Sequence, residues 1–360
     1  MSNLESVHSV AVITRTKDRP LFLERAARSV LGQHFADFVW VIVNDGGDPV
    51  AIEAFVHRHR HDAAGRIQVI HHPSPLGMQT ASNAGIAQSE STYVVIHDDD
   101  DTWDPTFLEC TTAHLERTGA MGVATATDIV MEQVEGDEIS TLEVSRRLPE
   151  MRTITIYRMC FENLFNPIAF VFRRQVLEEI GLFDQDLRGF GDWDFHLRFL
   201  ERYDVDYLDT PAALACYHKR PQATGDQRNS LFFDDQRVLA DKMFNKWLRA
   251  DLERGRMGLG FVMNSLRNGP VDTREAHDAV MALIGEKAEL VVSTLAEQIE
   301  VDSGSLSSTV IESSIRLEET LGRQHQGLIP ISHRILRRLR RAILEFRVDL
   351  SRAPSDRPPD

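Results

Sequence analysis

The residues with the clearest chemical meaning form the stretch VVIHDDDDTWDP, residues 94–105. Three β-branched residues lead through His97 into four consecutive aspartates, Asp98 to Asp101. Like charges this close repel by about 1 kcal/mol per pair even in water, and by more in a dry site. A hard cation makes such crowding favourable, and Mg²⁺ or Mn²⁺ commonly bridges a few carboxylates to the phosphates of a substrate. The stretch therefore predicts a divalent-metal site; the alternative is an acidic loop that binds nothing.

The aspartates end one of four short β-branched runs, at residues 9–15, 38–45, 66–72 and 92–98. Helical patterns separate the runs: Asp18 is a candidate N-cap with Pro20 in the first turn and Gly32 at the end, and Asp48 opens the next helix. This alternation predicts an α/β fold with a largely parallel sheet covered by helices on both faces.

Ligands of open parallel sheets bind beyond the carboxyl ends of the strands. Here three strand ends carry polar residues: Thr14 and Arg15, Asn44 and Asp45, and the aspartates from Asp98 onward. The sequence therefore predicts that these residues converge on one crevice. Asp104, which precedes Pro105 and a helical pattern, is better explained as a helix N-cap.

Composition excludes several classes of protein. A formal net charge of −15 argues against a general nucleic-acid binder. The sequence has no apolar run long enough to span a bilayer, and its N-terminus lacks the pattern of a signal peptide. Three widely separated cysteines match no zinc or disulfide spacing, which indicates free thiols. We expect a soluble cytoplasmic protein.

We predict a domain over residues 1–244, with a first half to about residue 101, a helical region over residues 245–350 and a disordered tail over residues 351–360. Apolar residues recur at helical spacing over residues 280–299 and 311–321. Residues 333–347 form a basic amphipathic pattern, which suits either a membrane-surface helix or an oligomerisation helix, and we favour packing or oligomerisation.

Four segments resemble, in order, the inverting glycosyltransferases of family 2, which have the GT-A fold. They are VAVITRTKDRPLFLERAARSVLGQ, FVWVIVNDGGD, GMQTASNAGIAQSESTYVVIHDDDD and AFVFRRQVLEEIGLFDQDLRGFGDWDFHLRFLE. Together they cover about residues 10–217, and an ordered set of this kind is far more specific than an Asp-x-Asp pair alone.

The resemblance implies roles for individual residues. Asp45 would bind the pyrimidine base of a nucleotide-sugar donor, with Thr14 and Arg15 lining the nucleoside pocket. Within the Asp-x-Asp signature, Asp100 would contact the metal, and Asp98 would contact the ribose or metal-bound water, with Asp99 between them on the donor side. Four identical residues leave this register open by one position. The family often has Arg-Asn where this chain has Ser82-Asn83, so one usual donor contact is missing.

Family members carry a Glu-Asp pair whose aspartate deprotonates the acceptor. Here the pair reads Gly191-Asp192, which leaves Asp192 as the base without the glutamate; capping of the following helix is the alternative role. The helix dipole should keep Asp192 ionised, with Asp194 in the first turn. Some relatives have a metal-binding histidine at the place of His218, which is equally compatible with an ordinary semi-buried histidine.

These inferences predict a metal-dependent inverting glycosyltransferase that uses Mn²⁺ or Mg²⁺. The donor would be a UDP- or dTDP-sugar, and the acceptor a glycan or lipid-linked saccharide of the cell surface. Two alternatives remain: a sugar nucleotidyltransferase, against which the glycine-poor segment ITRTKDRP argues, and a nucleotide- or glycan-binding scaffold without activity.

Overall fold

The structure is a computed structural model that describes residues 8–223, 225–227, 229, 233–255 and 257–267. The predicted helices of residues 280–347 and the predicted tail lie outside these residues. The described residues fall in one compact unit, which ends at Asn268. No described helix is long and apolar enough to cross a membrane.

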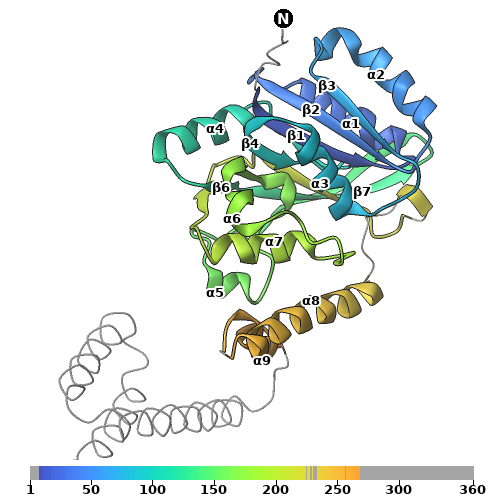
Figure 1. The fold of residues 1–360 in the computed structure, drawn as a ribbon. Helices are drawn as coiled ribbons and strands as arrows, with labels where there is room; N and C mark the ends of the chain where they lie inside the picture. The colour runs from blue at the N-terminus through green and yellow to red at the C-terminus, as the bar shows by residue number, and fades with distance from the viewer. Residues whose placement is uncertain (1–7, 224, 228, 230–232, 256, 268–360) are drawn as a thin grey trace, which may run out of the picture. The chain divides into compact units, whose positions relative to one another are not determined.

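A mixed sheet of seven strands, in the order β10-β6-β9-β4-β1-β2-β3, forms the centre (Figure 1). Its strands are β1 (His8–Thr16), β2 (Phe38–Asp45), β3 (Ile67–His72), β4 (Ser91–Ile96), β6 (Gly122–Thr125), β9 (Phe170–Arg173) and β10 (Asp206–Leu208). Strands β1 to β4 pair in parallel, and β9 runs antiparallel to both β4 and β6. The predicted α/β fold with a mostly parallel sheet is confirmed.

A second sheet has four strands in the order β5-β11-β7-β8. They are β5 (Thr102–Trp103), β7 (Thr127–Glu135), β8 (Glu138–Arg146) and β11 (Ala215–Lys219). The apolar run over residues 122–131 is therefore split at Ala126, with β6 in the large sheet and β7 in the small one. Strand β5 follows the aspartates directly, so both sheets meet at the acidic stretch.

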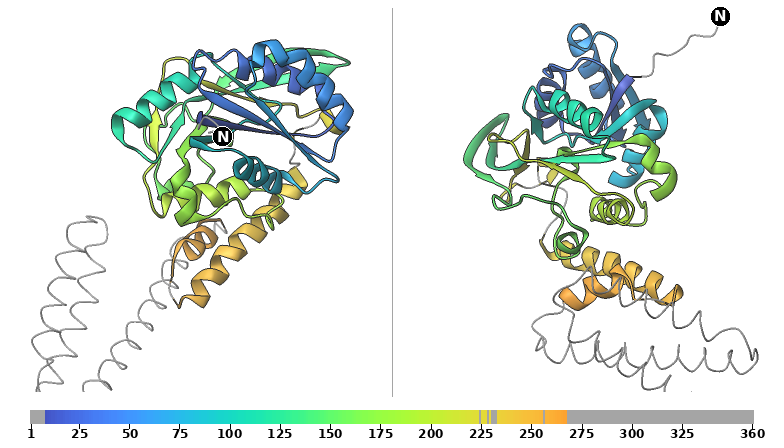
Figure 2. Two further views of the ribbon diagram at one scale, coloured as in Figure 1. Left: turned by 45° about the horizontal axis from the view of Figure 1, so that its top comes forward. Right: turned by 90° about the vertical axis from the view of Figure 1, so that its left-hand side faces the viewer.

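Helices cover both faces of the large sheet because successive strand residues point to opposite sides. On one face, Val10, Val12, Trp40 and Ile42 pack against α1 (Pro20–Leu31), α2 (Pro49–Ala63) and α4 (Phe107–Thr118). The two turned views show the blue helices α1 and α2 on one face and the yellow-green α7 on the other (Figure 2).

The opposite face packs Ala11, Ile13, Val41 and Val43 against α3 (Met78–Gln88) and α7 (Gly191–Leu200). Helix α3 approaches β1 so closely that a Cβ on Gly85 would lie 2.4 Å from Cγ2 of Ile13, so only glycine fits there. Shorter helical segments are α5 (Ile156–Met159), α6 (Leu177–Ile180), η1 (Pro167–Ala169), η2 (Arg174–Val176) and η3 (Gly225–Gln227).

The last described helices are α8 (Phe233–Glu253) and α9 (Leu259–Arg267). Met243, Phe244, Trp247 and Met263 belong to the same apolar cluster as α7. Helix α8 therefore runs across the predicted boundary at residue 244 without a break, and its apolar residues extend the core of the first domain.

Candidate active site

Strand β4 ends at Ile96, and the chain then turns tightly through the aspartates. The turn is fixed by His97, whose backbone N–H donates to the carbonyl of Ile13 at 2.8 Å, and by Asp101, whose N–H donates to the carbonyl of Asp98 at 3.2 Å. Asp99, Asp100 and Asp101 are buried, with exposed fractions of 1%, 6% and 1%. Buried carboxylates need cationic or hydrogen-bonding partners, and each of the four has them.

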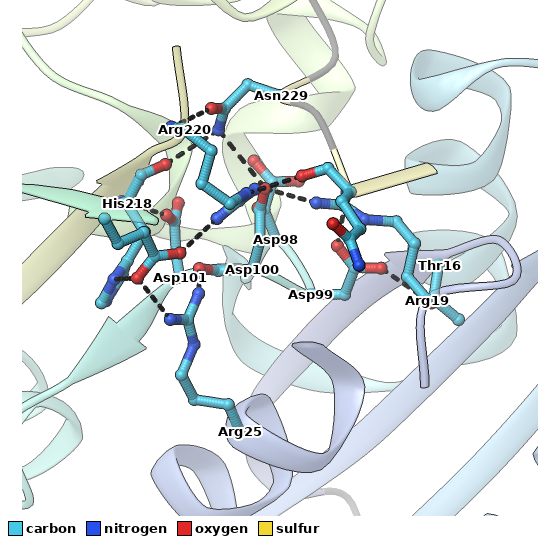
Figure 3. A network of polar contacts seen from close by, with 12 residues as sticks. Thr16, Arg19, Arg25, Asp98, Asp99, Asp100, Asp101, His218, Arg220 and Asn229 are labelled. Carbon is cyan, nitrogen blue, oxygen red and sulfur yellow. Dashed lines mark hydrogen bonds and ion pairs between the residues drawn. The ribbon is translucent and has the colours of Figure 1, made fainter. Parts of the chain in front are cut away.

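Arginines from both ends of the domain neutralise the first three aspartates (Figure 3). Arg15, at the end of β1, pairs with Asp98. Arg19 joins Asp99 at 2.9 Å and Asp100 at 2.6 Å, while Thr16 donates its hydroxyl proton to Asp99 at 2.8 Å.

Arg220, which follows β11, completes the neutralisation of the acidic turn. One of its guanidinium nitrogens pairs with Asp100, and the other lies 2.6 Å from Glu132. Glu132, on β7, also accepts from Arg25 at 2.7 Å and lies 2.8 Å from Nδ1 of His218. Glu132 is 3% exposed, so this buried carboxylate holds three groups, one from α1 and two from the end of β11 and the residue after it.

The neighbouring charges drive the pKa values of adjacent aspartates apart. Burial alone would raise the pKa of Asp100, but Arg19 and Arg220 outweigh it and bring that pKa to about 2. For Asp99, burial and the charges of Asp100 and Asp98 outweigh Arg19 and raise the pKa to about 7. Asp101 has a pKa well above its usual range, because it is buried beside Asp100 and Asp98. Burial and the neighbouring carboxylates therefore make a further proton or a cation favourable at this turn.

The same residues bear on a divalent metal. Among the described residues, no group of three or more histidine, cysteine, aspartate or glutamate side chains forms a ready-made metal site. Nε2 of His218 lies 2.9 Å from the hydroxyl of Thr102, and its Nδ1 faces Glu132. The predicted set Asp98, Asp100 and His218 is therefore not assembled as three ligands. Mg²⁺ and Mn²⁺ need only one or two carboxylates when substrate phosphates supply the other oxygens, and Asp98 and Asp100 meet that need.

A cleft of about 430 Å³ begins at the acidic turn. Its lining includes Arg15, Arg19, Asp45, Asp98, Asp99, Asp100, Asp192 and Tyr217. The cleft thus brings together all the predicted site residues except Thr14 and His218. Thr14 is fully buried, and its hydroxyl accepts a hydrogen bond from the indole of Trp40 at 2.8 Å. The prediction that Thr14 lines the pocket is corrected: Arg15 and Thr16 occupy that edge of the cleft.

Asp45 holds one wall of the cleft in place. Its carboxylate accepts from the backbone N–H groups of Leu76 and Gly77, each at 2.8 Å, and lies 2.8 Å from Nδ1 of His72. These bonds lower the pKa of Asp45 against the effect of burial. Asp45 therefore offers the cleft an ionised carboxylate, which accepts hydrogen bonds.

An arginine from β1 reaches the place near residue 82 where the family pattern usually has an arginine. Arg15 donates to the hydroxyl of Ser82 at 3.2 Å, so its guanidinium reaches the start of α3 from the end of β1. The cationic group expected near residue 82 is thus present in space, although it is displaced in the sequence.

Asp192 lines the same cleft from the first turn of α7. The helix starts after Phe190, whose φ of 58° is rare for a bulky residue and marks local strain beside the site. No side-chain cap is made here, so the capping alternative for Asp192 is wrong. Burial raises the pKa of Asp192 and outweighs the backbone N–H of Trp193 and the charge of Arg15. Burial therefore opposes the helix dipole, which favours the ionised form of this carboxyl.

Asn163 orients Asp192. Its amide nitrogen donates to Oδ2 of Asp192 at 2.8 Å, and its amide oxygen lies 2.9 Å from Nδ1 of His196. Because burial lowers the pKa of His196 to about 3, the ring is neutral and must carry its proton on Nδ1 to donate to that oxygen. One oxygen of Asp192 is thus held while the other remains for a ligand.

Several other predicted residues have structural roles. Asp104 accepts from the N–H and hydroxyl of Thr106 at 2.9 and 2.6 Å, one turn before α4, so it stabilises the helix start but is not the N-cap. Asp18 accepts from the N–H of Asp48 at 2.8 Å instead of capping its own helix.

Sequence reasoning did not find Arg19, Arg220, Glu132 or Asn163. Arg19 directly precedes Pro20, the first residue of the helix predicted after the first strand, and an arginine at that place could have indicated a cation near the strand ends. Glu132 lies in an alternating strand pattern, where a glutamate indicates solvent exposure, so nothing local distinguishes it.

Residues 9–181 match the family described as glycosyl transferase family 2. Over these residues, just under half of the chain, the protein is similar to glycosyl transferase family 2. Two curated relatives from Bacillus subtilis (strain 168) are the uncharacterized glycosyltransferases YwdF and EpsJ. YwdF is 26% identical over 58% of this chain and 73% of its own length, and EpsJ is 27% identical over 59% and 62%.

Solved structures resemble the fold of this chain. The S. aureus TarS 1–349 complex with UDP-GlcNAc has a TM-score of 0.51 and 17% identity, covering 66% of this chain and 65% of that one. The mannosyltransferase PcManGT of Pyrobaculum calidifontis, in complex with GDP-Man and Mn²⁺, has a TM-score of 0.50 and 14% identity, covering 82% and 81%. The chain spans less than two thirds of EpsJ and of the TarS fragment, and the structural likeness identifies the fold alone.

Proposed function

We propose that this protein transfers a sugar from a nucleotide-sugar donor to a hydroxyl group of a cell-surface glycan, with inversion at the anomeric carbon. One observation carries the proposal: a single cleft is lined both by the acidic turn after β4 and by Asp192 on α7. The similarity to family 2 supports transferase chemistry, and we assign the acidic turn as the donor end of the cleft and Asp192 as its acceptor end.

At the donor end, Asp45 would accept a hydrogen bond from the base of a UDP- or dTDP-type donor. Arg15, Arg19 and Lys17 line the same cleft and would face the diphosphate. Arg19 pairs with Asp99 and Asp100 in the protein alone, so its guanidinium would exchange a carboxylate for a phosphate when the donor binds. This exchange costs little, because the arginine keeps an anionic partner in both states.

A divalent ion fits this end, with Asp100 and Asp98 as its protein ligands and the donor phosphates completing the coordination. When bound, Mn²⁺ or Mg²⁺ would stabilise the charge that develops on the leaving diphosphate. It would also supply the positive charge that Arg19 and Arg220 give Asp100 in its absence. His218 would support the site indirectly, since it orients Glu132, which in turn holds Arg220.

At the acceptor end, Asp192 would take the proton of the attacking hydroxyl. Its raised pKa makes it a better base than an exposed aspartate, and Asn163 holds one of its oxygens so that the other faces the cleft. Attack from the face opposite the leaving diphosphate gives inversion. The missing glutamate of the family pair, replaced by Gly191, leaves Asp192 as the only carboxyl of that pair.

The test is thermal unfolding of the full chain with UDP, dTDP, GDP and their sugar derivatives, each with and without Mn²⁺. A ligand at a hundred times its dissociation constant adds about 2.7 kcal/mol to the free energy of unfolding. We expect a uridine or thymidine nucleotide to stabilise the protein with metal, and Asp100→Ala to abolish the effect. Asp192→Asn should keep nucleotide binding and lose transfer.

Two results point to the alternatives. If Asp192→Asn keeps full transfer, the protein uses another base and the acceptor assignment fails. If no nucleotide stabilises the protein in any condition, a scaffold without transferase activity becomes the better explanation. Release of diphosphate from a nucleoside triphosphate in the presence of a sugar phosphate would instead indicate a nucleotidyltransferase.

A further inference from the structure

One buried side-chain amide of the described chain lacks a hydrogen-bond partner. Four asparagine and glutamine residues are buried there: Gln33, Asn44, Gln79 and Asn83. In Gln33, Asn44 and Asn83, the amide nitrogen and the amide oxygen are both hydrogen-bonded. Gln79 is 5% exposed, yet its side chain makes no hydrogen bond to any described residue. Buried amides are normally paired because an unpaired one costs free energy, so Gln79 needs another partner.

The Gln79 amide lies in the cleft against the residue that precedes Asp192. Gln79 and Asp192 both line the cleft, so the small exposed part of the Gln79 side chain faces that space. A Cβ on Gly191 would lie 2.4 Å from Nε2 of Gln79 and 2.8 Å from its Cδ. The amide therefore occupies the space that a side chain at residue 191 would need, beside the first turn of α7, which carries Asp192.

The backbone beside Gln79 is bonded to the donor end of the cleft. The carbonyl of Met78 accepts from Arg15 at 3.5 Å, and Arg15 pairs with Asp98 of the acidic turn. Gln79 is the next residue after Met78, so its backbone lies at the donor end while its side chain reaches α7. A sugar that moves from a diphosphate at the acidic turn to a hydroxyl at Asp192 must lie between these two groups, which places it beside Gln79.

The helix that carries Gln79 is fixed to the segment that leads into α7. One turn further along α3, Asn83 exchanges two hydrogen bonds with the backbone of Phe183, at 2.8 and 3.0 Å. The amide is therefore held in position on a rigid element. An amide has N–H donors on one atom and an acceptor oxygen on the other, and a sugar hydroxyl both donates and accepts. Because Gln79 is uncharged, it suits the sugar better than the diphosphate.

We propose that the side-chain amide of Gln79 binds a hydroxyl group of the transferred sugar, in the space that Gly191 leaves beside Asp192. This inference rests on the proposed function and adds to it a residue that recognises the sugar part of the donor. Gln79 then makes no contact with the nucleoside or the diphosphate. The amide gives up no hydrogen bond to the described protein when it binds, so the new bond is not offset by the loss of an existing one.

The experiment measures dissociation constants of the full chain by thermal unfolding titrations with Mn²⁺. The ligands are UDP, UDP-glucose, UDP-galactose, UDP-N-acetylglucosamine, dTDP and dTDP-glucose, and each nucleotide sugar is compared with its own nucleoside diphosphate to isolate the effect of the sugar. Gln79→Met keeps the length and approximate volume of the side chain but removes the amide. Gly191→Ala displaces the amide from the side of α7. The control is Gln33→Met, which removes a similarly buried amide that does not line the cleft.

We expect Gln79→Met and Gly191→Ala to weaken binding of the tightest nucleotide sugar by about three- to tenfold, the effect of one neutral hydrogen bond, and to leave its nucleoside diphosphate unchanged. Gln33→Met should leave both dissociation constants unchanged. Without ligand, Gln33→Met should lower the unfolding midpoint, because it breaks hydrogen bonds, and Gln79→Met should not. Equal weakening of the nucleotide sugar and the diphosphate by Gln79→Met would overturn the proposal, and so would a fall in midpoint as large as that of Gln33→Met.

The same titrations separate this inference from the proposed function. If nucleotides stabilise the wild type and Gln79→Met binds every nucleotide sugar as the wild type does, only the role of Gln79 is wrong. If the wild type responds to no nucleotide, the proposed donor site itself is refuted. Gly191→Ala supplies the comparison should Gln79→Met fold poorly, since alanine is favourable in a helix, and unchanged binding of nucleotide sugars by this variant would contradict the proposal.

Discussion

We predict that Asp194→Asn will destabilise the protein strongly without touching the cleft. Asp194 follows the candidate base by two residues, but its side chain is fully buried on the other side of α7. There it pairs with Arg198 at 2.9 Å and with Lys246 at 2.9 Å, and it accepts from the indole of Trp247 at 3.0 Å. Lys246 and Trp247 belong to α8, so one carboxylate connects α7 to α8.

The magnitude follows from burial. Breaking a fully buried ion pair typically costs about 3–5 kcal/mol, and we expect about 3 kcal/mol here because Arg198 and Lys246 are 20% and 43% exposed and Lys246 keeps Asp184. A loss of this size lowers the midpoint of thermal unfolding by about 6 °C or more in a domain of this length. Asparagine keeps the size of the side chain, so the loss reports the charge and not a cavity.

The control is Asp184→Asn, because Asp184 shares the same partner, Lys246, at 2.5 Å but is 23% exposed. An exposed pair contributes at most about 1 kcal/mol, so this variant should change the midpoint little. The assay is thermal unfolding followed by circular dichroism, with Lys246→Met and the double variant Asp194→Asn/Lys246→Met to measure the coupling. If Asp194→Asn costs no more than Asp184→Asn, the argument that burial makes this pair essential is refuted.

Three further predictions concern the site. Burial raises the pKa of Asp192, so ionising this carboxyl destabilises the folded protein at pH values above the ordinary pKa of aspartate. Asp192→Asn should therefore raise the unfolding midpoint more at pH 8 than at pH 4.5. An equal change at both pH values would contradict the raised pKa. His218 and Arg25 outweigh burial and bring the pKa of Glu132 to about 2. This shift implies about 3 kcal/mol of stability, which is present above pH 4.5 and lost as pH falls toward 2. The free energy of unfolding of Glu132→Gln should therefore depend less on pH in that window than that of the wild type. Asn163→Ala removes a hydrogen bond to the ionised form of Asp192. The acid limb of the variant's pH–rate profile, for sugar transfer or donor hydrolysis, should therefore move to higher pH. A purely structural role for Asn163 would instead lower the rate equally at every pH.

Much of the large sheet followed from local pattern. The four β-branched runs became β1, β2, β3 and β4, because a strand buried on both faces shows as a continuous apolar run. The helix over α1 followed from Pro20 and Gly32. Strand β8 had no such signal, since it is an edge strand whose side chains are mostly exposed. The apolar run over residues 122–131 does not show the break between β6 and β7, because periodicity cannot reveal that a chain passes from one sheet to another.

The sequence by itself determined where the acidic residues must lie: at the carboxyl end of a buried strand, beside the ends of β1 and β2. It also placed Asp192 at the start of a helix. Only the tertiary structure decided which cations meet those carboxylates. Arg220 reaches Asp100 across 120 residues of chain, and Glu132 joins Arg25, His218 and Arg220. Local periodicity reports which face of an element is buried, but the partner of a buried charge depends on how distant elements pack.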